Sequence, residues 1–147
     1  MRKMIFVNLP VTDLARSVAF YEAVGATRNP MFSDDTAACM VFSETIHAML
    51  LTHEKWATFT DRAIPDAHAS AQVLLCVSED SRQAVDAVVE RAGRAGGLAD
   101  AFGQQDYGFM YSRAYADPDG HIWEVMWMDP QAAAQGPEAF MADGQGG

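Results

Sequence analysis

The order strand, helix and three strands occurs twice along this chain, and this repeat constrains its fold more than any other feature of the sequence. The first copy begins with an alternating stretch at residues 4–11, followed by a helical apolar pattern that ends at Gly25. Three short strand-like runs follow at residues 26–32, 36–43 and 46–52. Together these segments predict one βαβββ module.

The second copy starts at residue 70 and follows the same order. A strand at 70–77 leads into a helix at 79–92, then into a weak strand near Leu98 and two strands at 107–116 and 121–128. Shifting the first copy by 66 residues places Val11 over Val77 and Arg16 over Arg82. Shifting its last strand by 74 places His47 over His121 and Leu50 over Glu124. The two copies share a pattern of elements rather than many identical residues.

The repeat divides the chain into four segments. We expect a first module at residues 1–56, a linker at 57–69, a second module at 70–128, and a tail at 129–147. The linker is polar and contains Pro65. The tail is rich in Ala, Gln, Gly and Pro, a composition that predicts disorder.

Charge and cysteine usage exclude several classes of function. A formal net charge of −10 repels phosphate backbones, so nucleic-acid binding is not expected. No apolar run approaches the ~20 residues that cross a bilayer, so no membrane partner is expected, and the first residues do not resemble a secretory signal. Cys39 and Cys76 lie in apolar runs, which predicts buried, reduced thiols in a cytoplasmic protein.

Two motifs connect this pattern to a known family. Residues 11–21 read Val-Thr-Asp-Leu-Ala-Arg-Ser-Val-Ala-Phe-Tyr, and residues 117–124 read Asp-Pro-Asp-Gly-His-Ile-Trp-Glu. The second begins with tight-turn chemistry, because proline presets φ and glycine supplies a positive φ. Both motifs resemble those of the vicinal oxygen chelate superfamily, which includes glyoxalase I, fosfomycin and bleomycin resistance proteins, and extradiol dioxygenases. The resemblance covers residues 4–128.

The resemblance implies an α+β fold. Its two tandem βαβββ modules would form a curved, incomplete barrel-like mixed sheet with the helices on the outside. It also implies a homodimer, since the strand edges of such a small sheet need cover.

The resemblance further implies four inward-facing metal-ligand positions, which fall on Phe6, Leu50, Gln72 and Glu124. Phe6 and Leu50 cannot ligate, and Gln72 is a weak ligand. We therefore expect no metal and no other cofactor. If a divalent metal (Zn, Ni, Fe or Mn) is bound, Glu124 and Gln72 are its expected ligands.

We expect Glu124 to line a mostly apolar small-molecule cleft, since its same-face neighbours on the strand are apolar. His47 and His121 fall on the opposite face by the same alternation. Tyr111 and Arg113 share one strand face and form part of an aromatic stripe. That stripe either stacks a flat ligand and clamps its acid group, or faces solvent or a dimer partner with Arg113 paired to a surface acid. The residues expected to contact a ligand are Phe6, Asn8, Leu50, Gln72, Tyr111, Arg113 and Met126.

Two functions remain open at this level, and the sequence does not decide whether the protein is an enzyme. One is a binding protein, similar to the bleomycin-resistance branch, that sequesters an apolar or aromatic small molecule without the family's full metal centre. The alternative is a metal-dependent lyase or isomerase of the lactoylglutathione lyase type, with Glu124 as its catalytic ligand or general base.

Overall fold

A computed structural model describes residues 2–142, and it begins with a βαβββ module followed by a short helix. The strands of this first module form a sheet in the order β1-β4-β3-β2, in which β1 runs parallel to β4 and the other pairs are antiparallel. The elements are β1 (Ile5–Val11), α1 (Leu14–Ala23), β2 (Thr27–Asn29), the 3-10 turn η1 (Pro30–Phe32), β3 (Ala37–Val41), β4 (Ile46–Thr52) and α2 (His53–Ala57).

The second module repeats this arrangement with one additional short strand. Its sheet has the order β5-β9-β8-β6, with β7 paired to β8 and β5 parallel to β9. The elements are β5 (Leu75–Ser78), α3 (Arg82–Arg94), β6 (Leu98–Ala99), β7 (Gln105–Asp106), β8 (Met110–Ala116) and β9 (Ile122–Met128). The predicted α+β fold of two βαβββ modules is confirmed. In the described residues the strands form two mixed sheets and no closed barrel.

Side-chain caps and buried faces explain why the two long helices form. The Asp13 carboxylate accepts a hydrogen bond from the backbone N–H of Arg16, and the Ser81 hydroxyl accepts one from Ala84. Gly25, at φ +110°, ends the first helical segment in a conformation that other residues rarely adopt. The apolar face of α3 is buried against its sheet and consists of Val85, Val88, Val89 and Ala92.

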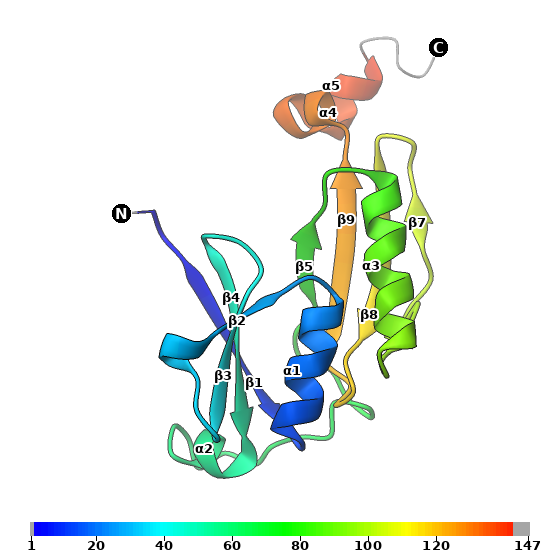
Figure 1. The fold of residues 1–147 in the computed structure, drawn as a ribbon. Coiled ribbons are helices and arrows are strands. Elements are labelled where there is room, and N and C mark those ends of the chain that lie inside the picture. Colours follow the sequence, from blue (N-terminus) through cyan, green and yellow to red (C-terminus); the bar gives the residue numbers. More distant parts are fainter. Residues whose placement is uncertain (1, 143–147) are drawn as a thin grey trace.

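The segment after β9 differs from the disordered tail that its composition predicted. It forms α4 (Pro130–Gln135) and α5 (Pro137–Phe140), which extend beyond the end of β9 (Figure 1). Phe140 is buried, with its ring centroid 6.2 Å from that of Phe109, and Ala132 is also buried. These two buried apolar residues pack the segment against the rest of the protein, which its overall composition did not predict. Residues 143–147 of the predicted tail lie outside the described part.

The two modules share one hydrophobic core. Helices α1 and α3 lie beside each other, each against its own sheet (Figure 1). Phe20 and Tyr21 of α1 reach the second sheet, where their rings approach those of Tyr115 and Trp123 at centroid distances of 5.8 and 6.1 Å. Because this core needs side chains from both halves, the two modules depend on each other for stability.

Hydrogen bonds between the two sequence motifs join the modules at one end. One Asp119 carboxylate oxygen accepts from the Thr12 backbone N–H at 3.0 Å and from its hydroxyl at 2.8 Å. The Tyr21 hydroxyl donates to buried Asp117 at 2.6 Å and accepts from Trp123 Nε1 at 3.0 Å. We call these five residues the motif clasp. Both motifs therefore serve to hold the fold together.

Each sheet has one face under its helix and one open face. On β9, Trp123 and Val125 join the core, so alternation places Glu124 and Met126 on the open face. Likewise, Leu9 of β1 is buried in the core, while Asn8 is exposed. Within residues 2–142, none of the helices has the length and apolar character needed to cross a membrane.

Candidate functional site

The strand registers change one of the four expected ligand positions. In the second sheet, Cys76 of β5 lies opposite Glu124 of β9. The shift of 66 residues makes Pro10 of β1 the counterpart of Cys76, and Pro10 lies opposite Leu51 of β4. Leu51 is therefore the counterpart of Glu124. The expectation that Leu50 faces the cleft was wrong, because Leu50 is fully buried in the shared core. The error is a slip of one residue, which reverses the face of every side chain in a strand.

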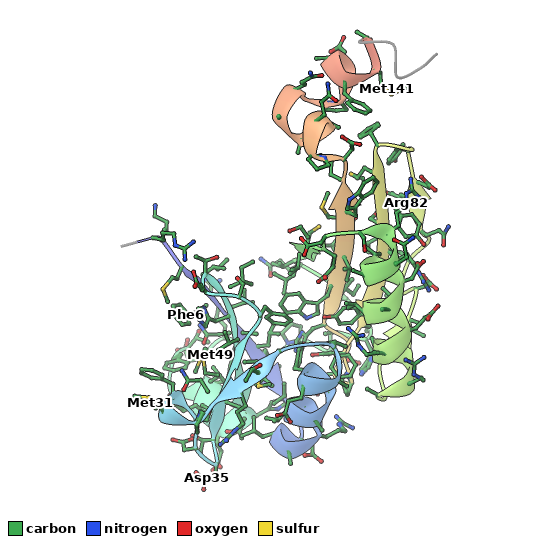
Figure 2. All side chains as sticks on the ribbon, turned by 45° about the horizontal axis from the view of Figure 1, so that its top comes forward. Phe6, Met31, Asp35, Met49, Arg82 and Met141 are labelled. Atoms are coloured by element: carbon green, nitrogen blue, oxygen red, sulfur yellow. The ribbon has the colours of Figure 1, made fainter. Side chains whose placement is uncertain are left out.

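Phe6 and His47 lie side by side on the open face of the first sheet. They are register partners on β1 and β4, and their rings stack at a centroid distance of 4.4 Å. His47 was expected beneath the helices, so its placement is a second consequence of the same slip. It is buried, and its Nδ1 has no hydrogen-bond partner in the described chain. Figure 2 shows Phe6 and Met49 close together on this module.

Glu124 lies on the open face of β9, next to Cys76 of β5. Burial and the nearby Glu124 carboxylate raise the pKa of the Cys76 thiol. Cys76 is nevertheless exposed, which differs from the buried thiol that its apolar run predicted, whereas Cys39 is buried as expected. No donor within residues 2–142 makes a hydrogen bond to Glu124. Met126 lies half-buried on the same face.

Tyr111 and Arg113 lie on the helix face of β8, so the expectation that they line the cleft was wrong. Arg113 lies opposite Val125, and Ala114 lies opposite Glu124, so the hairpin register separates Arg113 from the glutamate. The Arg113 guanidinium donates to Asp86 at 2.9 Å and to Asp100 at 3.0 and 2.9 Å.

These contacts give the Arg113 side chain a structural role. Its hydrogen bond lowers the pKa of Asp100, and a hydrogen bond from Tyr111 followed by one from Arg113 lowers the pKa of Asp86. With its side chain only 12% exposed, Arg113 ties α3 to the sheet. The pairing to acidic residues matches the alternative considered for this residue.

An apolar groove runs between β1 and the segment that leads into β5. Its volume is about 270 Å³. Asn8 and Gln72 border it, as do Leu75 and Ile122 from the second sheet and Trp56 from α2. A further hollow of about 220 Å³ adjoins it, lined by Asn8, Trp56, Phe59 and Thr60. Phe6, Glu124 and Met126 do not line this groove, although they lie on the open faces of the sheets.

Sequence reasoning missed the contribution of α2 to the groove. Trp56 is the last residue of the segment predicted as the first module and borders the polar linker, and a large aromatic residue at such a place was the available signal. Its position depends on α2, which the Thr52 hydroxyl caps by accepting a hydrogen bond from the Lys55 N–H. Because α2 packs against β1 and β4, it brings Trp56 to the edge of the groove.

A polar cavity of about 450 Å³ adjoins the apolar groove, and Pro10, Pro65, Ala67 and His121 border both. His121 Nε2 lies 2.8 Å from the Pro10 carbonyl oxygen. Since a carbonyl only accepts, this nitrogen carries the proton. The charged or titratable side chains that line the cavity come from α1, α2, the loop after α2 and the motif turn that leads into β9: Arg16, His53, Asp66, His68, Asp119 and His121.

The donor set at the four positions that the resemblance implies does not suit a transition-metal centre. With the corrected register, the four positions hold Phe6, Leu51, Gln72 and Glu124, so a single strong ligand type is present. In the described residues, no group of three or more histidine, cysteine, aspartate or glutamate side chains is arranged to hold a metal ion. This absence of a metal-binding arrangement holds for the three histidines of the polar cavity as well.

The fold and groove define a class of small proteins with paired βαβββ modules and a cleft between them. The family model described as Glyoxalase/Bleomycin resistance protein/Dioxygenase superfamily matches residues 3–125, and the chain belongs to this superfamily. No curated protein matches the sequence at a significant level.

Solved structures share the fold at low sequence identity. A hypothetical protein from S. aureus is 20% identical with a TM-score of 0.72, over 86% of this chain and 94% of that chain. A glyoxalase-related enzyme from Fulvimarina pelagi is 21% identical with a TM-score of 0.70, over 86% and 88%. The fosfomycin resistance protein FosX from Mesorhizobium loti is 15% identical with a TM-score of 0.63, over 91% and 98%. At these identities the likeness concerns the fold.

Proposed function

We propose that this protein binds an apolar or aromatic small molecule in the groove between its modules, without the metal centre of its metal-dependent relatives. The observation that carries the proposal is the replacement of ligand-type residues by Phe6 and Leu51 at two of the four metal positions, next to a formed apolar groove. A single glutamate and an amide hold a transition metal poorly.

The chemistry of the groove supports a ligand with flat or branched apolar groups. Leu75, Ile122 and Trp56 supply apolar contact surface, while the Asn8 and Gln72 amides can orient a polar substituent. An indole at the rim of a groove is suited to stacking on an aromatic ligand. Such a composition, mostly apolar with a few polar groups, is typical of small-molecule sites.

Glu124 supports a second candidate, a metal-independent lyase or isomerase. Its carboxylate lies on the open face, with Met126 as an apolar same-strand neighbour and no hydrogen-bond donor within the described chain. A carboxylate of this kind can accept a proton from a bound carbon acid. The groove and Glu124 are separate features, so substrate turnover would require the ligand to extend from the groove over β9.

We also propose that the protein is a homodimer in which these open faces are covered. Strands β1 and β5 are edge strands, each paired on one side only in the described chain. Apolar side chains near them are exposed: Ile5 at 55%, Phe6 at 47%, Val73 at 61% and Leu74 at 56%. Uncovered apolar edges favour association, and a two-fold partner offers the same surface in return.

Titration with phenylnaphthylamine, a neutral aromatic fluorophore, tests the proposed groove. We expect saturable binding to the native protein and about tenfold weaker binding to Trp56→Ala, because the indole is a main aromatic surface of the groove. Met31→Ala is the matched control, since Met31 is 84% exposed and lies outside the groove. Equal affinities for Trp56→Ala and the native protein would overturn the proposal.

A further inference from the structure

We infer that the polar cavity beside the groove binds the acid group of the ligand, so that the protein selects molecules with an apolar body and an anionic head. The inference rests on the proposed function of the groove and adds to it the chemical class of the ligand. A carboxylate, phosphonate or sulfonate would meet the same surroundings there.

The two spaces form one continuous binding surface. Pro10, Pro65, Ala67 and His121 border both, so a single molecule can contact both at once. The groove is lined mainly by apolar side chains, whereas the cavity adds Arg16, three histidines and two acids to a lining that also holds Ile64 and three prolines. The change from apolar to polar lining occurs at His121, where the imidazole is held by the Pro10 carbonyl.

The two acids in the cavity already have partners. Asp119 accepts hydrogen bonds from the N–H and hydroxyl of Thr12, and its second oxygen lies 3.4 Å from the Ser17 hydroxyl. Asp66 accepts from the backbone N–H of His68 at 2.9 Å. These bonds hold the two carboxylates toward their own donors, so Arg16 and the histidine rings are the groups left to contact an anion.

The nitrogen donors of the cavity have fewer partners. The Arg16 guanidinium donates to the Thr12 hydroxyl at 2.9 Å and lies 3.9 Å from Asp119, while 49% of its side chain is exposed. A guanidinium has five N–H donors, so Arg16 can also donate to a ligand. The His53 and His68 rings make no hydrogen bond within residues 2–142. Both residues are exposed and can turn toward an anion.

Arg16 is the one arginine or lysine among the residues that line the cavity, and each of the three histidine rings can add an N–H donor. The guanidinium and these ring nitrogens are the groups that an anionic head would contact.

Two fluorophores with nearly the same rings test the inference: neutral phenylnaphthylamine and anilinonaphthalene sulfonate, whose sulfonate is charged at neutral pH. We expect the sulfonate to bind more tightly, and its affinity to fall about tenfold in Arg16→Gln and in His53→Gln. The neutral probe should bind both variants as it binds the native protein. Arg28→Gln is the control, because it removes one exposed positive charge outside the cavity. Urea melts verify that each variant is folded.

The outcomes separate the two proposals. If the neutral probe binds but the sulfonate binds no more tightly, or if neither Arg16→Gln nor His53→Gln weakens the sulfonate, the acid-head inference is overturned and the groove stands. If neither probe binds the folded native protein, the groove proposal fails, and the inference fails with it. If Arg28→Gln weakens the sulfonate as much as Arg16→Gln does, the effect comes from net charge and the inference is also overturned.

Discussion

Tyr21→Phe should destabilise the fold strongly, although it removes a single oxygen atom. The Tyr21 hydroxyl is fully buried, where it donates to Asp117 at 2.6 Å and accepts from Trp123 Nε1 at 3.0 Å. Phenylalanine keeps the ring packing and deletes both hydrogen bonds. Asp117 then retains donors from the Asp119 and His121 backbones, while the Trp123 N–H loses its partner.

The expected loss in the free energy of unfolding is about 3–4 kcal/mol. A hydrogen bond to a charged group contributes about 1.5–3 kcal/mol, and a buried unsatisfied donor costs about 1–3 kcal/mol, with some relaxation reducing the sum. A domain of this kind has a total stability of about 5–15 kcal/mol, so the variant would lose a large fraction of it.

The loss should also depend on pH in a defined direction. Burial raises the pKa of Asp117 above its usual 3.8, while the hydrogen bond from Tyr21 lowers it. Removing the hydroxyl therefore raises the folded-state pKa of Asp117 further. At a pH where Asp117 is ionised in both the native protein and Tyr21→Phe, the variant loses the whole of this stability. The difference in stability becomes smaller as the pH falls through the folded-state pKa of Asp117, which lies above 3.8 in both proteins.

Urea unfolding of both proteins between about pH 7 and pH 4 measures this difference directly. Tyr107→Phe is the matched control, because Tyr107 is 56% exposed and should lose less than about 0.5 kcal/mol. A loss below about 1 kcal/mol for Tyr21→Phe at pH 7, or one that grows toward pH 4, would refute this account of the motif clasp.

Three further predictions concern the proposed site. Elemental analysis of protein purified without chelator should find far less than one Zn, Ni, Fe or Mn per chain, and a stoichiometric metal that disappears in Glu124→Gln would contradict this. Light scattering should give the mass of a dimer at a protein concentration of tens of micromolar, which typical affinities make sufficient. The mass of a monomer would contradict the proposal that a second copy covers the open faces. For a ligand that extends from the groove over β9, Glu124→Gln should change affinity or turnover at little cost in melting temperature, since shape is retained; an unchanged affinity and turnover would show that Glu124 is merely tolerated.

Much of the architecture could be predicted from sequence because local signals agree with it. Turn residues, helix caps and the repeated order of elements identify both modules, and the two motifs indicate the family. Tertiary packing could not be predicted in the same way. Phe140 finds a buried site beside Phe109 only after β8 and β9 are paired, so composition alone predicted disorder where α4 and α5 form.

The site was harder to predict because it depends on strand register. Within one strand, the alternation of side chains was sufficient to predict that Glu124 and Met126 share one face of the sheet. Placing Leu50 and Arg113 required the alignment of one strand against another, where a shift of one residue reverses the face. The polar cavity joins residues 16, 53, 68, 119 and 121, which only the folded chain brings together. No local pattern in the sequence signals that arrangement.

We propose that ligand binding resides in the groove and does not require a metal. Calorimetric titration of phenylnaphthylamine into protein dialysed against EDTA, and into the same protein with equimolar Zn²⁺ restored, tests it most directly. We expect dissociation constants that agree within about twofold, since the groove-lining residues do not depend on a metal. Binding that is absent after EDTA treatment and returns with Zn²⁺ would contradict it.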